Sequence, residues 1–146
     1  MNTHVKFCVP LTVYYDKSCP LCSTEIHALR DRDWRGRLKL VDCSAKEFDE
    51  SELARAGLTR EQVMRRMHVR DPEGRWLVAL DAFEAIYAAA GLQCVAQVWG
   101  SGRLRPLLSP LYGWIADHRQ LLSRLGMHRL VGLLLRRATR HERGLA

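Results

Sequence analysis

Residues 16–22 of the chain read Asp16-Lys17-Ser18-Cys19-Pro20-Leu21-Cys22, a Cys-x-x-Cys pair directly after an apolar run. That run, Leu11–Tyr15, is rich in β-branched and aromatic residues, which predicts a buried or half-buried strand. Pro20 has no N–H and a preset φ, so it suits the first position of a helix and makes Cys19 the N-cap. We therefore predict a strand, a turn at residues 16–18 and a helix that runs to about Arg32.

The positions of the two cysteines predict that their thiols differ. Cys19 lies among the unpaired N–H groups of the helix start, which favour its thiolate. Such a position lowers a cysteine pKa from about 8.5 into roughly the 3.5 to 7.5 range. Cys22 lies about one turn further along and shares an inward face with Ile26 and Leu29. We expect Cys19 to be exposed and to attack, and Cys22 to face the core and resolve.

The turn carries two charged residues, Asp16 and Lys17. Lys17 would reinforce a thiolate at Cys19, whereas a carboxylate aimed at the same sulfur would oppose it. Two roles stay open for Asp16: it accepts the proton of Cys22 during resolution, or it caps the turn.

The motif Asp16-x-x-Cys19-x-x-Cys22, after Val13-Tyr14-Tyr15, resembles the signature of the DCC family of predicted thiol-disulfide oxidoreductases, thioredoxin-like proteins named for this motif. The resemblance covers roughly residues 11 to 120. Further segments occur in the order that the family shows: Arg37–Asp42, Met67–Asp71, Gly74–Trp76 and Asp81–Phe83. The Cys-Pro-Leu-Cys pair also resembles the Cys-Pro-aromatic-Cys of glutaredoxins. The resemblance implies a thioredoxin-like fold and thiol-disulfide chemistry at Cys19 and Cys22.

The segments after the first helix alternate between strand and helix patterns. Residues 38–42 predict a second strand, and residues 48–56 a short helix stopped by Gly57. Thr59 and Gln62 have the spacing of a capping box, which predicts another short helix through about Arg66.

A hairpin is predicted next, because residues 67–70 and 75–80 flank Asp71-Pro72-Glu73-Gly74, which suits a type I turn. Asp81 with Glu84 then predicts a capped helix that Gly91 ends. The order β-α-β-α-β-β-α is that of the thioredoxin fold. We thus expect an α/β fold with a central mixed sheet flanked by helices.

Residues 92–146 predict an appended helical segment on a redox core of residues 1–91. Helical patterns occur around residues 93–99, 107–118 and 121–140, interrupted by glycine and proline. Residues 1–100 carry 14 basic and 14 acidic side chains, so the net charge of +7 comes from residues 101–146, where nine arginines face two acidic residues. This basic extension would contact an acidic partner or a membrane surface, or it packs on the core or on a second subunit with its arginines solvated. No base-reading motif is present, so we expect no specific nucleic acid partner.

One departure from the thioredoxin pattern lies before the hairpin. Those enzymes usually place a cis-proline there against the active-site sulfurs, whereas this chain has Arg65-Arg66-Met67. Met67 or His68 would fill the space, and His68 could donate a hydrogen bond or a proton near Cys19, although a packed histidine is the simpler expectation. The missing proline bears on the backbone that would pair with a bound peptide. It therefore weakens the expectation of protein disulfides as substrates more than the expectation of thiol chemistry.

Composition bounds the remaining possibilities. The 146 residues, 47% of them hydrophobic, suit one compact domain, and no basic-then-apolar leader or apolar run of bilayer length is seen. Five irregularly spaced cysteines favour a reducing compartment, so we expect a cytoplasmic protein. Cys8, Cys43 and Cys94 are expected to be buried small hydrophobes. The predicted chemistry requires no organic cofactor and no metal.

Two other functions compete with a dithiol-disulfide oxidoreductase acting on a disulfide-containing protein or a small thiol. A zinc-binding module would use the Cys-x-x-Cys pair with Cys43, Cys94, Cys8 or His68 as further ligands. A second paired motif, usual for structural zinc, is missing from the sequence. A redox-inactive adaptor would instead dock through the arginine-rich C-terminal helices.

Overall fold

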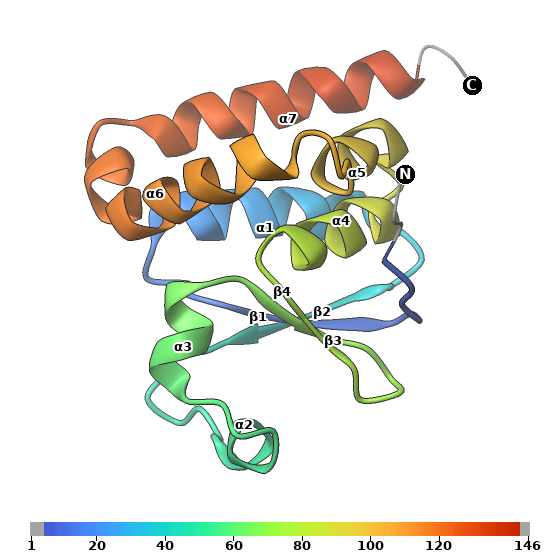
Figure 1. Ribbon diagram of the computed structural model, residues 1–146. Coiled ribbons are helices and arrows are strands. Elements are labelled where there is room, and N and C mark those ends of the chain that lie inside the picture. The colour runs from blue at the N-terminus through green and yellow to red at the C-terminus, as the bar shows by residue number, and fades with distance from the viewer. Residues whose placement is uncertain (1–4, 144–146) are drawn as a thin grey trace.

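The computed structural model describes residues 5–143, with a four-stranded mixed sheet at its centre (Figure 1). The strands are β1 (Leu11–Tyr15), β2 (Leu38–Asp42), β3 (His68–Arg70) and β4 (Trp76–Val78), in the spatial order β2-β1-β3-β4. β1 runs parallel to β2 and antiparallel to β3, and β3 pairs antiparallel with β4. The predicted α/β fold with a mixed sheet is confirmed, and it has the succession of a thioredoxin-like domain.

Helices cover both faces of this sheet. Their bounds are α1 (Pro20–Arg32), α2 (Ser51–Arg55), α3 (Arg60–Arg65), α4 (Leu80–Ala89), α5 (Gln93–Trp99), α6 (Arg105–Arg124) and α7 (Met127–Arg143). In Figure 1, α1 and α4 lie on one side of the sheet and α2 and α3 on the other, while α6 and α7 form a further layer beyond α1. The C-terminal helices therefore lie against the helix that carries the two cysteines.

Alternation along β1 divides the core into two parts. Leu11, Val13 and Tyr15 face α1 and α4 in the main hydrophobic cluster. Tyr14 faces the other way and packs in a smaller cluster that includes Leu53 of α2 and Val63 of α3. Because successive side chains of a strand point to opposite faces, the five residues of β1 pack against the helices on both sides of the sheet.

The predicted hairpin turn is present. The N–H of Gly74 donates to the carbonyl of Asp71 at 3.0 Å, which closes the turn, and Gly74 has a φ of +86°. The buried Asp71 carboxylate also accepts the N–H of Arg75 at 2.9 Å. The capping box of α3 is present as well, with Thr59 and Gln62 exchanging hydrogen bonds.

The predicted capping box of α4 is wrong. The helix begins at Leu80, after Ala79 with a φ of 55°, and no side chain caps it. Asp81 pairs with Arg105 of α6, and Glu84 is buried beside Gly100, at the end of α5. Both carboxylates, which the sequence spacing predicted to cap α4, therefore contact distant segments of the chain instead. The helix predicted at residues 48–56 also begins later, at Ser51.

The division into helical segments around residues 107–118 and 121–140 is wrong, because α6 runs from Arg105 to Arg124 without interruption. Pro106 lies in the first turn, where no intrahelical donor is needed, and Pro110 is accommodated within the helix. The chain turns at Gly126, which has a φ of +84°. Leu92, Ala96 and Leu135 join the main cluster, so the core is continuous across residue 91, and the division into 1–91 and 92–146 stays a prediction. Within residues 5–143, no helix has both the length and the apolar character to cross a bilayer.

Candidate redox site

The turn between β1 and α1 is held by Asp16. Its carbonyl accepts the N–H of Cys19 at 3.2 Å, and its carboxylate accepts the N–H of Ser18 at 2.9 Å. Pro20 begins α1, and Cys19 is the N-cap with an extended backbone, both as predicted. The short turn and the proline together fix the first cysteine at the start of the helix and the second about one turn along it.

The two thiols interact directly, and this separates their pKa values. The Cys22 side chain hydrogen-bonds the Cys19 sulfur, which, with further donors, lowers the pKa of Cys19 to about 6. The same hydrogen bond, with burial, raises the pKa of Cys22 far above its usual range. At neutral pH the pair is therefore one thiolate, on Cys19, and one thiol, on Cys22.

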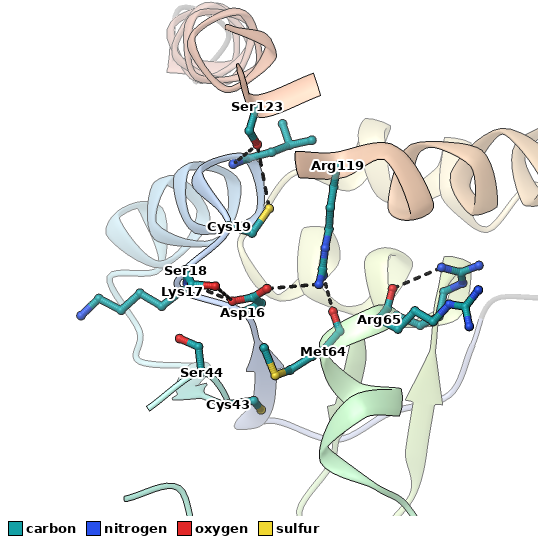
Figure 2. A network of polar contacts seen from close by, with 12 residues as sticks. Asp16, Lys17, Ser18, Cys19, Cys43, Ser44, Met64, Arg65, Arg119 and Ser123 are labelled. Carbon is teal, nitrogen blue, oxygen red and sulfur yellow. Dashed lines mark hydrogen bonds and ion pairs between the residues drawn. The ribbon is translucent and has the colours of Figure 1, made fainter. Parts of the chain in front are cut away.

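The exposed Cys19 expected from the sequence is wrong. Its side chain is 0% exposed, whereas Cys22 is only half-buried. The reason is the end of α6, which lies over the start of α1 and packs Leu122 against Cys19 and Leu21. The Ser123 hydroxyl lies 4.0 Å from the Cys19 sulfur and accepts the N–H of Leu21 at 3.1 Å (Figure 2). Ser123 thus takes one of the free N–H groups of α1 that Cys19 leaves uncapped.

Arg119 is the charged residue of the site that sequence reasoning missed. Its guanidinium lies between the turn and α3, with Nη2 3.1 Å from Oδ2 of Asp16 and Nη1 donating to the carbonyl of Met64 (Figure 2). Its positive charge lowers the pKa of Cys19. Helical spacing carried a signal, because Arg119 is four residues after Ile115 and three before Leu122, on the apolar side of α6. A charge on that side needs a buried partner, here Asp16.

Asp16 and Lys17 therefore differ in their surroundings. Asp16 is 3% exposed, and its carboxylate both braces the turn and pairs with Arg119. Its service as a proton acceptor for Cys22 stays a prediction. The Lys17 side chain is exposed and points away from Cys19 in Figure 2. The cation with the largest effect on Cys19 is Arg119.

Met67 and His68 point to opposite faces of the sheet. Met67 lies on the side of α1, and its N–H donates to the hydroxyl of Tyr112 at 2.9 Å. His68 is buried on the other face, 6.5 Å from the ring of Trp76, and its Nδ1 is 2.8 Å from the carbonyl of Arg66. Burial lowers the pKa of His68. At the position where thioredoxins have a cis-proline, which has no N–H, the N–H of Met67 thus donates to Tyr112 of α6.

A cavity of about 540 Å³ lies between the core and α6 and α7, with Cys22 in its wall. Its surface is almost entirely apolar, formed by Met67, Phe83, Trp99, Tyr112 and Leu135 among others. Cys19 is not part of this surface. The two sulfurs therefore face different surroundings, a packed contact for Cys19 and an apolar cavity for Cys22.

A family model described as DCC1-like thiol-disulfide oxidoreductase matches residues 13–125. The chain belongs to the DCC1-like family. The matched residues include Cys19, Cys22, Arg119 and Ser123, so the DCC1-like match takes in α6 as well as the motif. The resemblance stated from the motif is thereby confirmed.

The chain is also similar to an uncharacterized chloroplastic protein of Arabidopsis thaliana, with 27% identity over 110 residues. The alignment covers 75% of this chain and 50% of the plant protein, so the chain spans about half the length of the curated relative that it matches. No solved structure matches the chain.

The further ligands that a zinc site would need do not gather at this DCC1-like pair. Over the part of the chain that the structure describes, one group of three possible ligand residues lies within 4.8 Å of one another, namely Cys8, Asp71 and Glu73, and it contains neither Cys19 nor Cys22. Cys43 is buried as predicted, and burial raises its pKa to about 12. Cys94 is exposed and Cys8 half-buried, so burial of these two is wrong.

Proposed function

We propose that this protein is a dithiol-disulfide oxidoreductase in which Cys19 attacks a substrate disulfide and Cys22 resolves the intermediate. The Cys19 thiolate displaces one substrate sulfur as a thiolate, which takes up a proton, and a mixed disulfide forms on Cys19. Cys22 then loses its proton and attacks the Cys19 sulfur, which releases the second substrate thiol. Two electrons pass from the protein dithiol to the substrate, and the protein is left with a Cys19–Cys22 disulfide.

The observation that carries the proposal is the placement of the two thiols at the start of α1, with Cys19 at the N-cap and Cys22 about one turn along the helix. Interaction with Cys22 lowers the pKa of Cys19, while interaction with Cys19 and burial raise the pKa of Cys22, so attack by Cys19 would precede resolution by Cys22. A nucleophile with a pKa near 6 is almost fully ionised at neutral pH. Membership of a family described as thiol-disulfide oxidoreductases supports the same chemistry.

Attack from Cys19 requires the end of α6 to move. The polar contacts that hold it beside the pair and the hairpin include Ser123 with Leu21, Arg119 with Asp16, and Tyr112 with Met67. Their loss would uncover both the Cys19 sulfur and the backbone before β3. A disulfide-bearing protein or a small disulfide would reach the thiolate in that open form.

The partners of the C-terminal helices are part of the proposal as well. Leu130, Leu133 and Leu134 are exposed on α7, near the exposed Arg129 and Arg136. This combination supports contact with an acidic partner or an anionic membrane surface. A reducing compartment such as the cytoplasm would keep the dithiol in the form described here.

A redox titration in glutathione buffers tests the function, with alkylation and mass spectrometry reporting each cysteine of the metal-free and the as-purified protein. We expect one reversible two-electron transition confined to Cys19 and Cys22. Cys22→Ser should trap a mixed disulfide on Cys19, Cys19→Ser should abolish exchange, and Cys43→Ser should leave it unchanged. Thiols that react only after chelation would establish the zinc module, and normal cellular function of Cys19→Ser would establish the adaptor.

A further inference from the structure

The apolar cavity meets the redox pair at Cys22 alone. Cys22 lies in its wall, about one turn along α1, whereas Cys19 is fully buried beneath Ser123 and Leu122. A molecule in the cavity would reach the Cys22 sulfur without any movement of α6. The cavity volume of about 540 Å³ falls within the range of about 300–1,000 Å³ that is usual for small-molecule sites.

The polar groups around the cavity already have partners within the protein. The hydroxyl of Tyr87 donates to the carboxyl of Glu25 at 2.6 Å. The hydroxyl of Tyr112 accepts from Met67, and Arg119 is held by Asp16 and the carbonyl of Met64. A ligand with polar groups would have to leave them unpaired or disrupt these bonds, either of which is costly. The cavity thus suits an apolar ligand whose reactive atom does not require a hydrogen bond.

A thiol sulfur is a reactive atom that needs no hydrogen bond. The proposed reaction also requires a thiol, because the oxidised pair has to be reduced again. Once Cys19 has reduced a substrate, the protein holds a Cys19–Cys22 disulfide and must be re-reduced. A thiol that enters through the cavity meets the Cys22 sulfur of that disulfide. Attack there makes Cys19 the leaving group, and thiols of low pKa leave fastest.

We propose that this cavity binds an apolar dithiol, which re-reduces the Cys19–Cys22 disulfide by attack on Cys22. This inference rests on the proposed function, because it names the electron donor of the same pair. One thiolate of the dithiol forms a bond to the Cys22 sulfur, the Cys19–Cys22 bond breaks, and Cys19 leaves as a thiolate. The second thiol loses its proton and attacks the donor sulfur, which closes the donor into a cyclic disulfide and releases Cys22, which takes up a proton. The donor loses two electrons and the protein gains them.

Dihydrolipoamide, an uncharged dithiol with an apolar chain, is the probe, and dithiothreitol is the polar comparison. The oxidised full-length protein is mixed with each, quenched with acid, alkylated and analysed by mass spectrometry. Leu111→Asp places a charge in the cavity wall, and Leu107→Asp places the same charge on α6 outside it; both leucines are well exposed, at 48% and 66%. A third arm uses benzyl mercaptan, an apolar monothiol, to locate the mixed disulfide.

We expect dihydrolipoamide to reduce the protein about tenfold faster than dithiothreitol after normalisation to thiolate concentration. Leu111→Asp should remove this advantage and leave the dithiothreitol rate unchanged, while Leu107→Asp should alter neither rate. Benzyl mercaptan should be found on Cys22. Equal rates for the two dithiols, equal effects of the two variants, or an adduct on Cys19 would each overturn the proposal. If no Cys19–Cys22 disulfide forms under oxidation, the proposed function fails and this inference fails with it; reduction by dithiothreitol without a preference for dihydrolipoamide overturns the inference alone.

Discussion

Nη2 of Arg119 in α6 lies 3.1 Å from Oδ2 of Asp16 in the turn before α1, although 103 residues separate the two along the chain. The pair joins the C-terminal helices to the segment that positions both cysteines. Asp16 is almost fully buried, and its carboxylate contacts this partner and the donors of the turn. Stability and thiol chemistry should consequently respond together when the pair is broken.

Arg119→Met should destabilise the protein by roughly 2 kcal/mol, because it leaves the Asp16 carboxylate buried without its cation. It should also raise the pKa of Cys19. Urea unfolding and thiolate absorbance at 240 nm measure the two effects. Arg124→Met, at an exposed position of the same helix, is the control and should change neither quantity. Adding Asp16→Asn to Arg119→Met should recover part of the lost stability; a double variant less stable than Arg119→Met would contradict the pairing.

The thiolate of Cys19 should titrate near pH 6 in the reduced protein. Because the folded pKa is lower than the ordinary value of 9.0, the thiolate adds to the free energy of unfolding above pH 9, and this contribution falls away as the pH drops through 6. Absorbance at 240 nm as a function of pH gives the midpoint. In Cys22→Ala the midpoint should move upward, because alanine has no donor to replace the thiol that contributes most to the shift. An unchanged midpoint in that variant would show that the thiol pair is not the cause.

Ser123→Ala should destabilise the protein by about 1 kcal/mol, because the N–H of Leu21 loses its acceptor in a buried place. The pKa of Cys19 should rise as well, since the Ser123 hydroxyl stabilises the thiolate. Ser109→Ala changes an exposed serine of the same helix and is the matched control. The prediction fails if the two alanine variants unfold at the same urea concentration.

Tyr112→Phe removes the acceptor of the Met67 N–H while keeping the ring in the cavity wall. Hydrogen exchange at the Met67 amide, followed by NMR, should become about fivefold faster, since loss of a net hydrogen bond of about 1 kcal/mol favours local opening. Tyr15→Phe, which removes a hydroxyl that contacts His27, should leave that amide unaffected. Equal exchange at Met67 in both variants would show that α6 does not protect this backbone.

The sequence was sufficient for features that depend on near neighbours along the chain. Pro20 placed the start of α1, Thr59 with Gln62 placed α3, and the Asp71–Gly74 turn placed the hairpin, because each rests on the backbone preference of a few residues. The family motif agreed with these elements and with the observed sheet.

The failures share a different cause, which is packing between distant segments. Cys19 has the local features of an exposed N-cap, and only the end of α6 buries it. Asp81 and Glu84 have capping-box spacing, yet Arg105 and the buried surroundings of Gly100 decide where their side chains lie. Arg119 could have been suspected from its place on the apolar side of a helix, but its partner Asp16 could not, since nothing local relates the two positions.

The burial of Cys19 under the end of α6 should also affect how readily this sulfur is oxidised by peroxides. Peroxides oxidise cysteines that are both ionised and accessible, and the products beyond sulfenic acid are largely irreversible. Cys19 is ionised near neutral pH but has no accessible surface, so hydrogen peroxide should modify the exposed Cys94 before it reaches the reactive sulfur. Burial under α6 thus protects the Cys19 thiolate even from an oxidant as small as hydrogen peroxide. The sulfur is open to oxidation only while a bound substrate keeps the end of α6 displaced.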